Sequence, residues 1–252
     1  MCPVHRNDGE ISSIGRAAAL LKELRTSGSA LGVASLARRC DLPKSTVHRL
    51  LNEMTRVGLV ERSTLGYTPG LLLFELGQLV PRTRSLRDAA RPHMLNLHDA
   101  TGHNVALAVL EGAEVVYVDL FRSNHARRFP QRLGGRWPAH ASCSGKAILA
   151  FSDTDVASTV GGGPLRRLTE RTISDPSVLT AELTRIRCAG VAYDRQESIH
   201  GVVGVAAPIL DGAGGALGAI AMSGFVGRIN LSRVDAAVRT GALAISREML
   251  RG

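Results

Sequence analysis

Long apolar runs are missing from this chain of 252 residues. No stretch reaches the ~18 uninterrupted apolar residues that suggest a transmembrane helix. The first residues, MCPVHRNDGE, also lack the apolar segment of a secretory signal. We therefore expect a cytoplasmic protein without a membrane partner, in which residues 1–12 form a flexible tail.

Paired thiols and paired metal ligands are missing as well. The four cysteines form no C-x-x-C pair, and the eight histidines form no H-x-x-x-H or H-E-x-x-H pattern. Unpaired cysteines favour a reducing compartment. We expect free thiols, no metal ion and no other cofactor.

Acidic residues are scarce where basic residues gather. The net charge is +9 and the isoelectric point is about 10.2. Residues 122–136 contain five arginines and no Asp or Glu. Such basicity is typical of proteins that bind a polyanion, although many solvated surfaces are also basic.

Three short helices are predicted near the N-terminus, over about residues 13–27, 33–40 and 43–57. In the first, Ile14 shares an apolar face with Leu21 and Leu24. A tight turn at Asp41-Leu42 separates the second from the third, and Asp tolerates the left-handed conformation that such a turn uses. This order of helices indicates a helix-turn-helix.

The third helix has two unlike faces. Its apolar face carries Val47, Leu50, Leu51, Met54 and Val57, and its polar face carries Ser45, His48, Arg49, Asn52 and Arg56. Arginine binds guanine bidentately, and asparagine reads adenine. The polar face therefore suits the major groove of DNA.

A hairpin is predicted directly after this helix. Leu59–Arg62 and Tyr67-Thr68 flank a turn at Ser63–Gly66. Such a hairpin is the wing of a winged helix-turn-helix and can lie against DNA phosphates. The alternative is a small helical domain with a solvated charged face, but the order of three helices, turn and wing favours DNA binding. The candidate DNA-binding residues are Lys44, Ser45, Thr46, His48, Arg49, Asn52 and Arg62.

The segment LARRCDLPKSTVHRLLNEMTRVGLVER carries a family resemblance. With its surroundings from Ser13 to Gly77, it resembles the DNA-binding domain of IclR-type bacterial transcription regulators. We assign residues 13–80 to this domain.

Residues 81–101 are expected to form a linker helix. Leu71–Val80 is predicted to be a helix that Pro81 stops, and the sequence Ser85–Asp88 resembles a capping box that starts the next one. Pro92 is expected to kink or restart that helix before it ends near Ala100.

Residues 102–252 have the pattern of an antiparallel sheet flanked by helices. A hairpin is predicted from Val105–Leu110 and Val115–Phe121 with a four-residue loop, and a second from Gly201–Ile209 and Ala216–Met222. Helices are expected after HASCSGK, over about 179–188, and at the C-terminal end. The expected fold class is α+β.

Catalytic motifs are incomplete in this domain. Ser144-Gly145-Lys146 lacks the first glycine and the final hydroxyl of a phosphate-binding loop, and the S-x-x-K spacing of a Ser–Lys hydrolase is absent. We therefore expect no enzymatic activity.

A small-molecule site fits the same segment better. Backbone N–H groups of Cys143–Gly145 at a helix start can seat a carboxylate. Asp194 can accept a hydrogen bond from an uncharged donor on the ligand, and Trp137 and Phe129 can form an apolar wall. Each residue also has a purely structural interpretation, as strand cap or core.

The IclR resemblance continues through HASCSGKAILA, GVAYDRQE, GVVGVAAPI and AMSG, in the family's order. It implies a GAF-like domain that binds a small metabolite, commonly an organic acid. It marks as candidate effector-binding residues Phe129, Trp137, Cys143, Ser144, Asp194, Val202, Gly204, Ala221 and Ser223.

Two of these residues depart from the family pattern. Family members often have cysteine at Gly204 and serine at Ala221. Losing both polar groups should open volume, so we expect an effector larger and less polar than glyoxylate or pyruvate, such as an aromatic acid or its derivative.

The resulting hypothesis is a ligand-responsive transcription regulator of a catabolic operon. Its partners would be double-stranded operator DNA, a small organic acid or derivative, and further copies of itself in a homodimer or a dimer of dimers. The rival hypothesis is a metabolite-binding enzyme or sensor without a DNA function. The sequence leaves repression and activation equally open.

Overall fold

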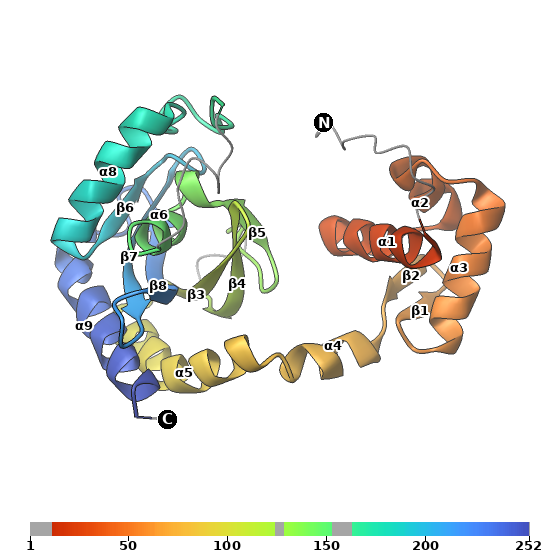
Figure 1. Ribbon diagram of the computed structural model, residues 1–252, viewed down its shortest axis with the longest axis horizontal. Coiled ribbons are helices and arrows are strands. Elements are labelled where there is room, and N and C mark those ends of the chain that lie inside the picture. Colours follow the sequence, from red (N-terminus) through yellow and green to blue (C-terminus); the bar gives the residue numbers. More distant parts are fainter. Residues whose placement is uncertain (1–11, 124–128, 153–162, 252) are drawn as a thin grey trace. The chain divides into compact units, whose positions relative to one another are not determined.

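The structure, a computed structural model, describes residues 12–123, 129–152 and 163–251 (Figure 1). The chain divides into two units between Val80 and Pro81. Most of the expected tail and two arginines of the basic loop, Arg127 and Arg128, lie outside the described residues.

Unit 1 contains the helices and hairpin that the sequence predicts. Its elements are α1 (Ser13–Ser27), α2 (Val33–Cys40), α3 (Lys44–Arg56), β1 (Val60–Ser63), β2 (Gly66–Pro69) and α4 (Leu71–Gln78). Ser12 caps α1 by accepting a hydrogen bond from the Gly15 N–H at 3.1 Å. Asp41 ends α2 with a φ of 53°, the left-handed conformation expected there.

The core of unit 1 joins its first three helices. Leu20 and Leu24 of α1 pack with Leu36 of α2 and with Leu51 of α3. Two inward-facing predictions are wrong. Ile14 is 83% exposed because the first turn of α1 lies outside this core, and Val57 is 46% exposed. Val57 is the C-cap of α3, where the backbone leaves helical geometry and with it the helical face.

The β1–β2 hairpin is held to the helices by a short bridge that the sequence analysis did not predict. Leu31, between α1 and α2, exchanges two backbone hydrogen bonds with Tyr67 of β2, at 3.0 and 2.9 Å. The wing is therefore anchored through β2, whose other edge pairs with β1.

Unit 2 is built on one antiparallel sheet. Its elements are α5 (Pro81–Thr101), β3 (Asn104–Glu111), β4 (Glu114–Phe121), β5 (Arg136–Pro138), a 3-10 turn (Ala139–Ala141), α6 (Cys143–Leu149), α8 (Pro176–Ala189), β6 (Ala192–Arg195), β7 (Val202–Leu210), β8 (Ala216–Phe225) and α9 (Leu231–Met249). The six strands lie in the order β5-β4-β3-β8-β7-β6. Both hairpins and the α+β class follow the prediction.

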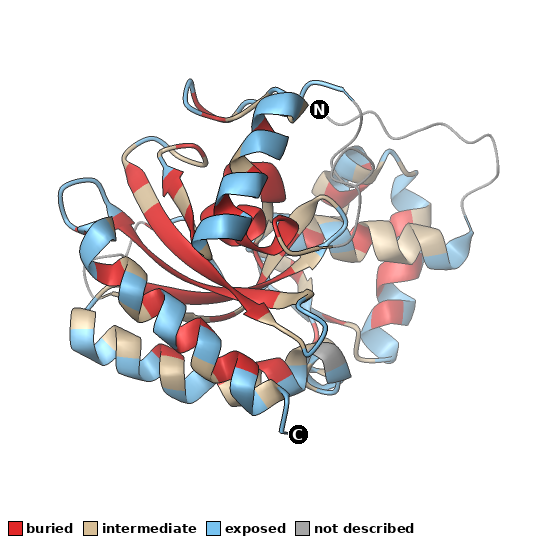
Figure 2. Cartoon of the chain, turned by 60° about the vertical axis from the view of Figure 1, so that its left-hand side comes forward, coloured by how far each residue is buried: buried red, intermediate tan, exposed pale blue. Residues whose placement is uncertain are grey.

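Side-chain size differs between the two faces of this sheet. Large residues of β3, β7 and β8, such as Leu107, Ile209 and Met222, face the core that α5 and α9 cover. The alternate positions are mostly small, among them Ala106, Ala206 and Ala221. Because the strands are buried on both faces (Figure 2), helices must cover each side.

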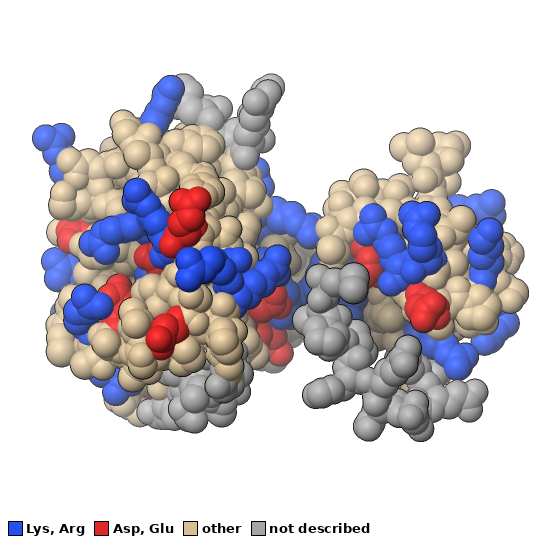
Figure 3. Space-filling model, turned by 90° about the horizontal axis from the view of Figure 1, so that it is seen from above, with Lys and Arg blue, Asp and Glu red and all other residues tan. Residues whose placement is uncertain are grey.

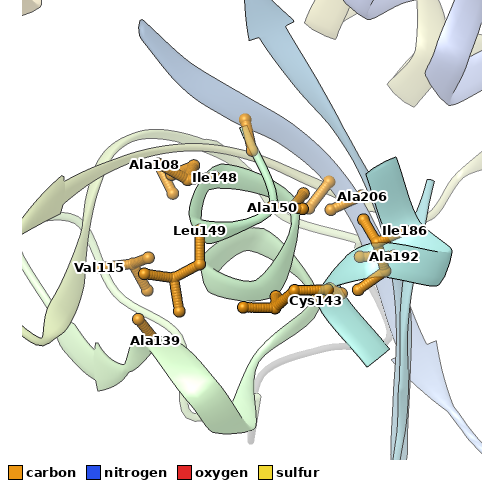
Figure 4. Close-up of a cluster of buried hydrophobic side chains, with 14 of the residues drawn as sticks. Ala108, Val115, Ala139, Cys143, Ile148, Leu149, Ala150, Ile186, Ala192 and Ala206 are labelled. Atoms are coloured by element: carbon orange, nitrogen blue, oxygen red, sulfur yellow. The ribbon is translucent and has the colours of Figure 1, made fainter. Parts of the chain in front are cut away.

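Helix α6 occupies the room that the small residues leave. Ile148 and Leu149 pack among alanines of the strands and Ile186 of α8 (Figure 4). Gly145 shows how close the packing is, because a Cβ at this position would lie 2.2 Å from the Ala139 oxygen.

Several expected boundaries in unit 2 are wrong. Helix α5 begins at Pro81 instead of Ser85, since proline fits the first position of a helix. It remains a single helix through Pro92, and Leu86 and Met94 on either side of the proline are buried against the sheet. The first hairpin closes with two loop residues instead of four, because Glu111 pairs with Glu114. The three-residue strand β5 was not predicted.

Candidate functional site

The polar face of α3 is open to solvent. Ser45, His48, Arg49 and Asn52 are exposed, whereas Val47, Leu50, Leu51 and Met54 on the opposite face are buried. Asn52 Nδ2 lies 3.4 Å from His48 Nδ1, so these two side chains support each other. The guanidinium of Arg49 has no ion-pair partner among the described residues, which leaves its donors available.

Other candidates extend this surface. Lys44 is exposed and Thr46 half-buried at the start of α3, and Arg62 is exposed on β1 of the wing. Arg56 differs, because its guanidinium is paired with Glu53 at 2.8 Å. Among the basic residues of α3, Lys44 and Arg49 therefore carry the positive charges that acidic neighbours neutralise least.

Basic side chains outnumber acidic ones in unit 1. Residues 12–80 contain nine Lys or Arg and five Asp or Glu. In the face shown in Figure 3, Lys and Arg side chains are spread over this unit and only a few acidic groups interrupt them. This balance favours contact with a polyanion.

A cavity lies on the small-residue face of the sheet in unit 2. Seven of the nine candidate effector-binding residues line it: Phe129, Trp137, Cys143, Asp194, Val202, Gly204 and Ser223. Segments from 129 to 223 thus converge at one place. The other two candidates, Ser144 and Ala221, are buried behind its wall and do not line it.

Six other residues line the cavity without having been predicted from the sequence: Tyr117, Gln131, Ser142, Ser198, Ile199 and Val203. A tyrosine among the valines of β4 was a usable signal for Tyr117, because a buried phenol needs a hydrogen-bond partner. Gln131 lies in an irregular segment and carries no such signal.

The cavity is nearly closed, with a volume of about 10 Å³, roughly enough for one water molecule. The expectation that Gly204 opens volume is wrong in this structure. A Cβ at Gly204 would lie only 2.9 Å from Cys143 Sγ, so the cysteine side chain already fills that space.

Asp194 is buried at the cavity and organises the turn that follows β6. Its Oδ1 accepts from the Glu197 N–H at 2.7 Å and its Oδ2 accepts from the Ser198 hydroxyl. Burial raises the pKa of Asp194 to about 6, although these hydrogen bonds act in the opposite direction. The carboxyl therefore changes its charge near neutral pH.

Gln131 bridges two strands across the cavity. Its Nε2 donates to the Tyr117 hydroxyl at 2.9 Å, and its Oε1 accepts from the Ser223 hydroxyl at 3.2 Å. Tyr117 lies on β4 and Ser223 on β8. This bridge, together with Phe129, closes the cavity from one side.

The expected carboxylate seat at Cys143–Gly145 is only partly available. Helix α6 has seven residues, and the Gly145 N–H donates to the capping hydroxyl of Ser142 at 3.1 Å. Burial raises the pKa of Cys143 to about 12. At neutral pH its thiol is thus a neutral, packed group.

Lys146 of α6 is fully buried directly behind the cavity. Its Nζ lies 2.5 Å from Glu197 Oε2 and 3.9 Å from Glu182 Oε1 of α8. Glu197 also donates its N–H to Asp194. The lysine therefore ties α6 to the Asp194 turn and does not face the cavity.

Within the described residues, no three His, Cys, Asp or Glu side chains are grouped so that they could hold a metal ion. No helix there is long and apolar enough to cross a membrane.

Helix α3 is exposed, carries side chains that can read DNA bases, and is followed by a wing; we call it the reading helix. The same chain carries a sheet unit with a buried polar cavity. Together these features define a DNA-binding transcription regulator with an effector-binding domain. Residues 13–64 match the IclR helix-turn-helix domain, and residues 79–247 match the domain described as "Bacterial transcriptional regulator IclR C-terminal". The chain belongs to the IclR family of bacterial transcription regulators.

Individual relatives resemble the chain over nearly its whole length. The transcriptional repressor IclR of Escherichia coli K12 is 32% identical over 231 residues, which cover 90% of this chain and 84% of that protein. An IclR homolog from Microbacterium hydrocarbonoxydans, solved in complex with 4-hydroxybenzoate, has a TM-score of 0.85 at 29% identity and covers 94% of this chain and 99% of its own. The Thermotoga maritima IclR structure has a TM-score of 0.75 at 27% identity, with 95% and 99% covered.

The buried ion pair yields a stability prediction. Lys146→Ala leaves Glu197 charged and unpaired in the interior, which should lower the free energy of unfolding of unit 2 by about 3–5 kcal/mol. Urea denaturation followed by fluorescence of Trp137, the single tryptophan, measures unit 2 alone.

Arg185→Ala is the matched control. It removes a pair with the same Glu182, but its own side chain is 71% exposed, so its effect should stay below about 1 kcal/mol. Equal effects of the two substitutions would show that the buried pair is not a stability determinant.

Proposed function

We propose that this regulator senses an aromatic acid, with a hydroxybenzoate as the representative ligand, and thereby controls a catabolic operon. The observation that carries the proposal is the composition of the cavity wall. The chain has nine aromatic residues, and Tyr117, Phe129 and Trp137 all line this one cavity. Phe225 extends the group, because its ring meets that of Phe129 edge-to-face at 5.6 Å.

The similarity to the M. hydrocarbonoxydans homolog supports the same ligand class. That protein was solved with 4-hydroxybenzoate, and its fold covers 94% of this chain. In the proposed arrangement the ring lies between the aromatic side chains and the ligand hydroxyl donates to Asp194. The ligand carboxylate accepts from Gln131 and Ser223, which are already joined by one hydrogen bond from the Ser223 hydroxyl to Gln131 Oε1.

The closed cavity makes binding dependent on a rearrangement. Its present volume of about 10 Å³ does not admit a benzene ring. Phe129 and Gln131 fill one side, so ligand entry has to displace or repack them. A ligand that binds one arrangement better than another shifts the population of both, and this is how an effector changes DNA affinity.

On the DNA side, we propose that α3 enters the major groove and that the β1–β2 wing contacts the backbone. Arg49 and Asn52 would read base edges, while Lys44 and Arg62 would bind phosphate. The chain acts where the chromosome is, in the bacterial cytoplasm. Several relatives carry the name repressor, and repression is the proposed direction of control.

A catalytic role is not part of this proposal. The Cys143 thiol has a pKa of about 12 because of burial, and Lys146 is enclosed by Glu197 and Glu182. Neither is presented to the cavity as an activated nucleophile. Turnover of a bound acid without any salt-dependent DNA binding would favour the enzyme alternative.

A homodimer is proposed from the surface of α4. None of the residues of this helix is buried, and Leu71 and Phe74 of the helix and Leu79 at its C-cap are each more than 60% exposed. An apolar helix of this kind normally marks an interface. A second copy of the chain is the proposed partner, since two reading helices suit a near-palindromic operator and a single one binds little surface.

The ligand class is tested by a thermal-shift screen. We expect 4-hydroxybenzoate to raise the melting temperature, benzoate to raise it less because it lacks the donor to Asp194, and glyoxylate to have no effect. The preference for 4-hydroxybenzoate should fall as the pH is lowered through about 6, where Asp194 becomes protonated and a poorer acceptor.

Asp194→Ala should remove the preference and Asp99→Ala, at an exposed position of α5, should keep it. Stabilisation by glyoxylate alone would overturn the aromatic assignment.

The reading helix is tested with Arg49→Ala on an operator selected from random-sequence DNA. We expect operator affinity to fall by about 10- to 100-fold while binding to non-specific DNA changes little. Lys22→Ala, an equal loss of charge on the exposed surface of α1, is the control. If Arg49→Ala discriminates operator from random DNA as well as the parent chain does, Arg49 is not a reading residue.

The proposed dimer is tested by sedimentation equilibrium of Phe74→Asp. A buried charge at the interface should raise the dimer dissociation constant by about 100-fold. Leu65→Asp, at a wing position that is 82% exposed, is the control and should leave the constant unchanged. A Phe74→Asp chain with the parent's association would place the interface elsewhere.

A further inference from the structure

A second, larger cavity lies at one end of the sheet in unit 2. Its volume is about 390 Å³, within the range of small-molecule sites. It is formed by the C-terminal turn of α5, the residues before β3, and the end of β8. The lining residues are His98, Thr101, Gly102, His103, Asn104, Ser123, Ser223, Gly224, Phe225 and Arg228.

The floor of this second cavity is buried and polar. Asn104 is 2% exposed; its Nδ2 donates to the Ser223 oxygen at 3.2 Å and its Oδ1 accepts from the Ser123 N–H at 3.0 Å. An asparagine amide has two donor hydrogens, and the fold uses one of them. The second hydrogen is available to a ligand in the cavity.

The charge of the lining is positive. Arg228 is an exposed guanidinium at the rim and has no ion-pair partner among the described residues. No Asp or Glu is among the lining residues that the structure describes. His103 lies beside the floor, where burial lowers its pKa. A carboxylate would thus find a cation and further donors without an opposing negative charge.

His98 adds a hydrogen-bond acceptor. Its Nδ1 lies 2.8 Å from the His103 main-chain oxygen. Since a carbonyl oxygen only accepts, the neutral ring carries its proton on Nδ1 and its lone pair on Nε2. Phe225, 37% exposed, gives an apolar surface at the rim.

We propose that this cavity is a second ligand site, which binds a small hydroxylated organic acid with its carboxylate at Arg228 and Asn104 and its hydroxyl at His98. It is distinct from the effector cavity but touches it at two points. Ser223 lines both cavities. Phe225 lines the second cavity and packs on Phe129 of the first at 5.6 Å. Occupation of one site therefore has a structural route to the other, which makes the second site a candidate modulator of the first.

The test follows each cavity with its own reporter in the full chain. The probe is 4-hydroxybenzoate, with neutral 4-hydroxybenzamide as its uncharged counterpart. Imidazole NMR signals of His98 and His103, assigned with His98→Gln and His103→Gln, report the second cavity. Fluorescence of Trp137, the single tryptophan, reports the effector cavity. We expect both histidine signals to shift with the acid, and the amide to bind about tenfold more weakly.

Arg228→Gln is the decisive variant. It should weaken the histidine response by about tenfold. The tryptophan response should change much less, because only the coupling between the two cavities connects Arg228 to Trp137. Arg233→Gln, an exposed arginine of α9 outside the cavity, should change the histidine response by less than about twofold.

The two reporters separate this inference from the proposed effector class. A tryptophan response with no histidine response, or a histidine response that Arg228→Gln does not weaken, overturns the second site and leaves the effector proposal intact. A histidine response that depends on Arg228 without a tryptophan response supports the second site and counts against the effector class. If neither the histidine NMR signals nor the Trp137 fluorescence responds to the acid, the second site is overturned.

Discussion

The ion pair between Lys146 and Glu197 fixes the geometry on which the effector cavity depends. Lys146 belongs to α6, whose N-cap Ser142 and first residue Cys143 line the cavity. Glu197 belongs to the turn after β6 and donates its N–H to Asp194. A single 2.5 Å contact therefore joins two of the segments that supply polar groups to the site. Because both charges are buried, loss of Lys146 leaves Glu197 uncompensated, and loss of Glu197 leaves Lys146 with only the more distant Glu182.

The contact between Lys146 and Glu197 depends on the sheet, because its two faces carry side chains of different size. Leu107, Ile209 and Met222 fill the face covered by α5 and α9, and alanines occupy the other face. The small face lets α6 approach closely enough to bring its lysine between two glutamates. The same face leaves space for a cavity that the chain fills with Phe129, Gln131 and Cys143 in the structure described here. Sensing then requires exchanging these internal contacts for contacts with a ligand, which couples binding to conformation.

Periodic patterns explain how much of this was predictable. The buried and exposed faces of α3 and both hairpins of unit 2 follow from local spacing, since periods of 3.6 and 2 report which side chains point inward. Five of the seven candidate cavity residues lie in motifs of the family, and Phe129 and Trp137 were found as aromatic residues just upstream of the first motif. Gln131 was not, because its partner Ser223 is 92 residues away and no local pattern encodes that hydrogen bond. The predicted start of α5 is too late because proline, which ends the preceding helix, also suits the first turn of the next one. The fit of Cys143 into the space at Gly204 is a packing fact that residue identity alone does not reveal.

The most direct test is whether the effector cavity and the reading helix are linked. Operator affinity of the full chain is measured with and without saturating 4-hydroxybenzoate, and the affinity for 4-hydroxybenzoate is measured with and without operator. A linked regulator predicts that both affinities change by the same factor, about 5- to 150-fold. Operator affinity that is unchanged by a bound acid would contradict the proposed regulation.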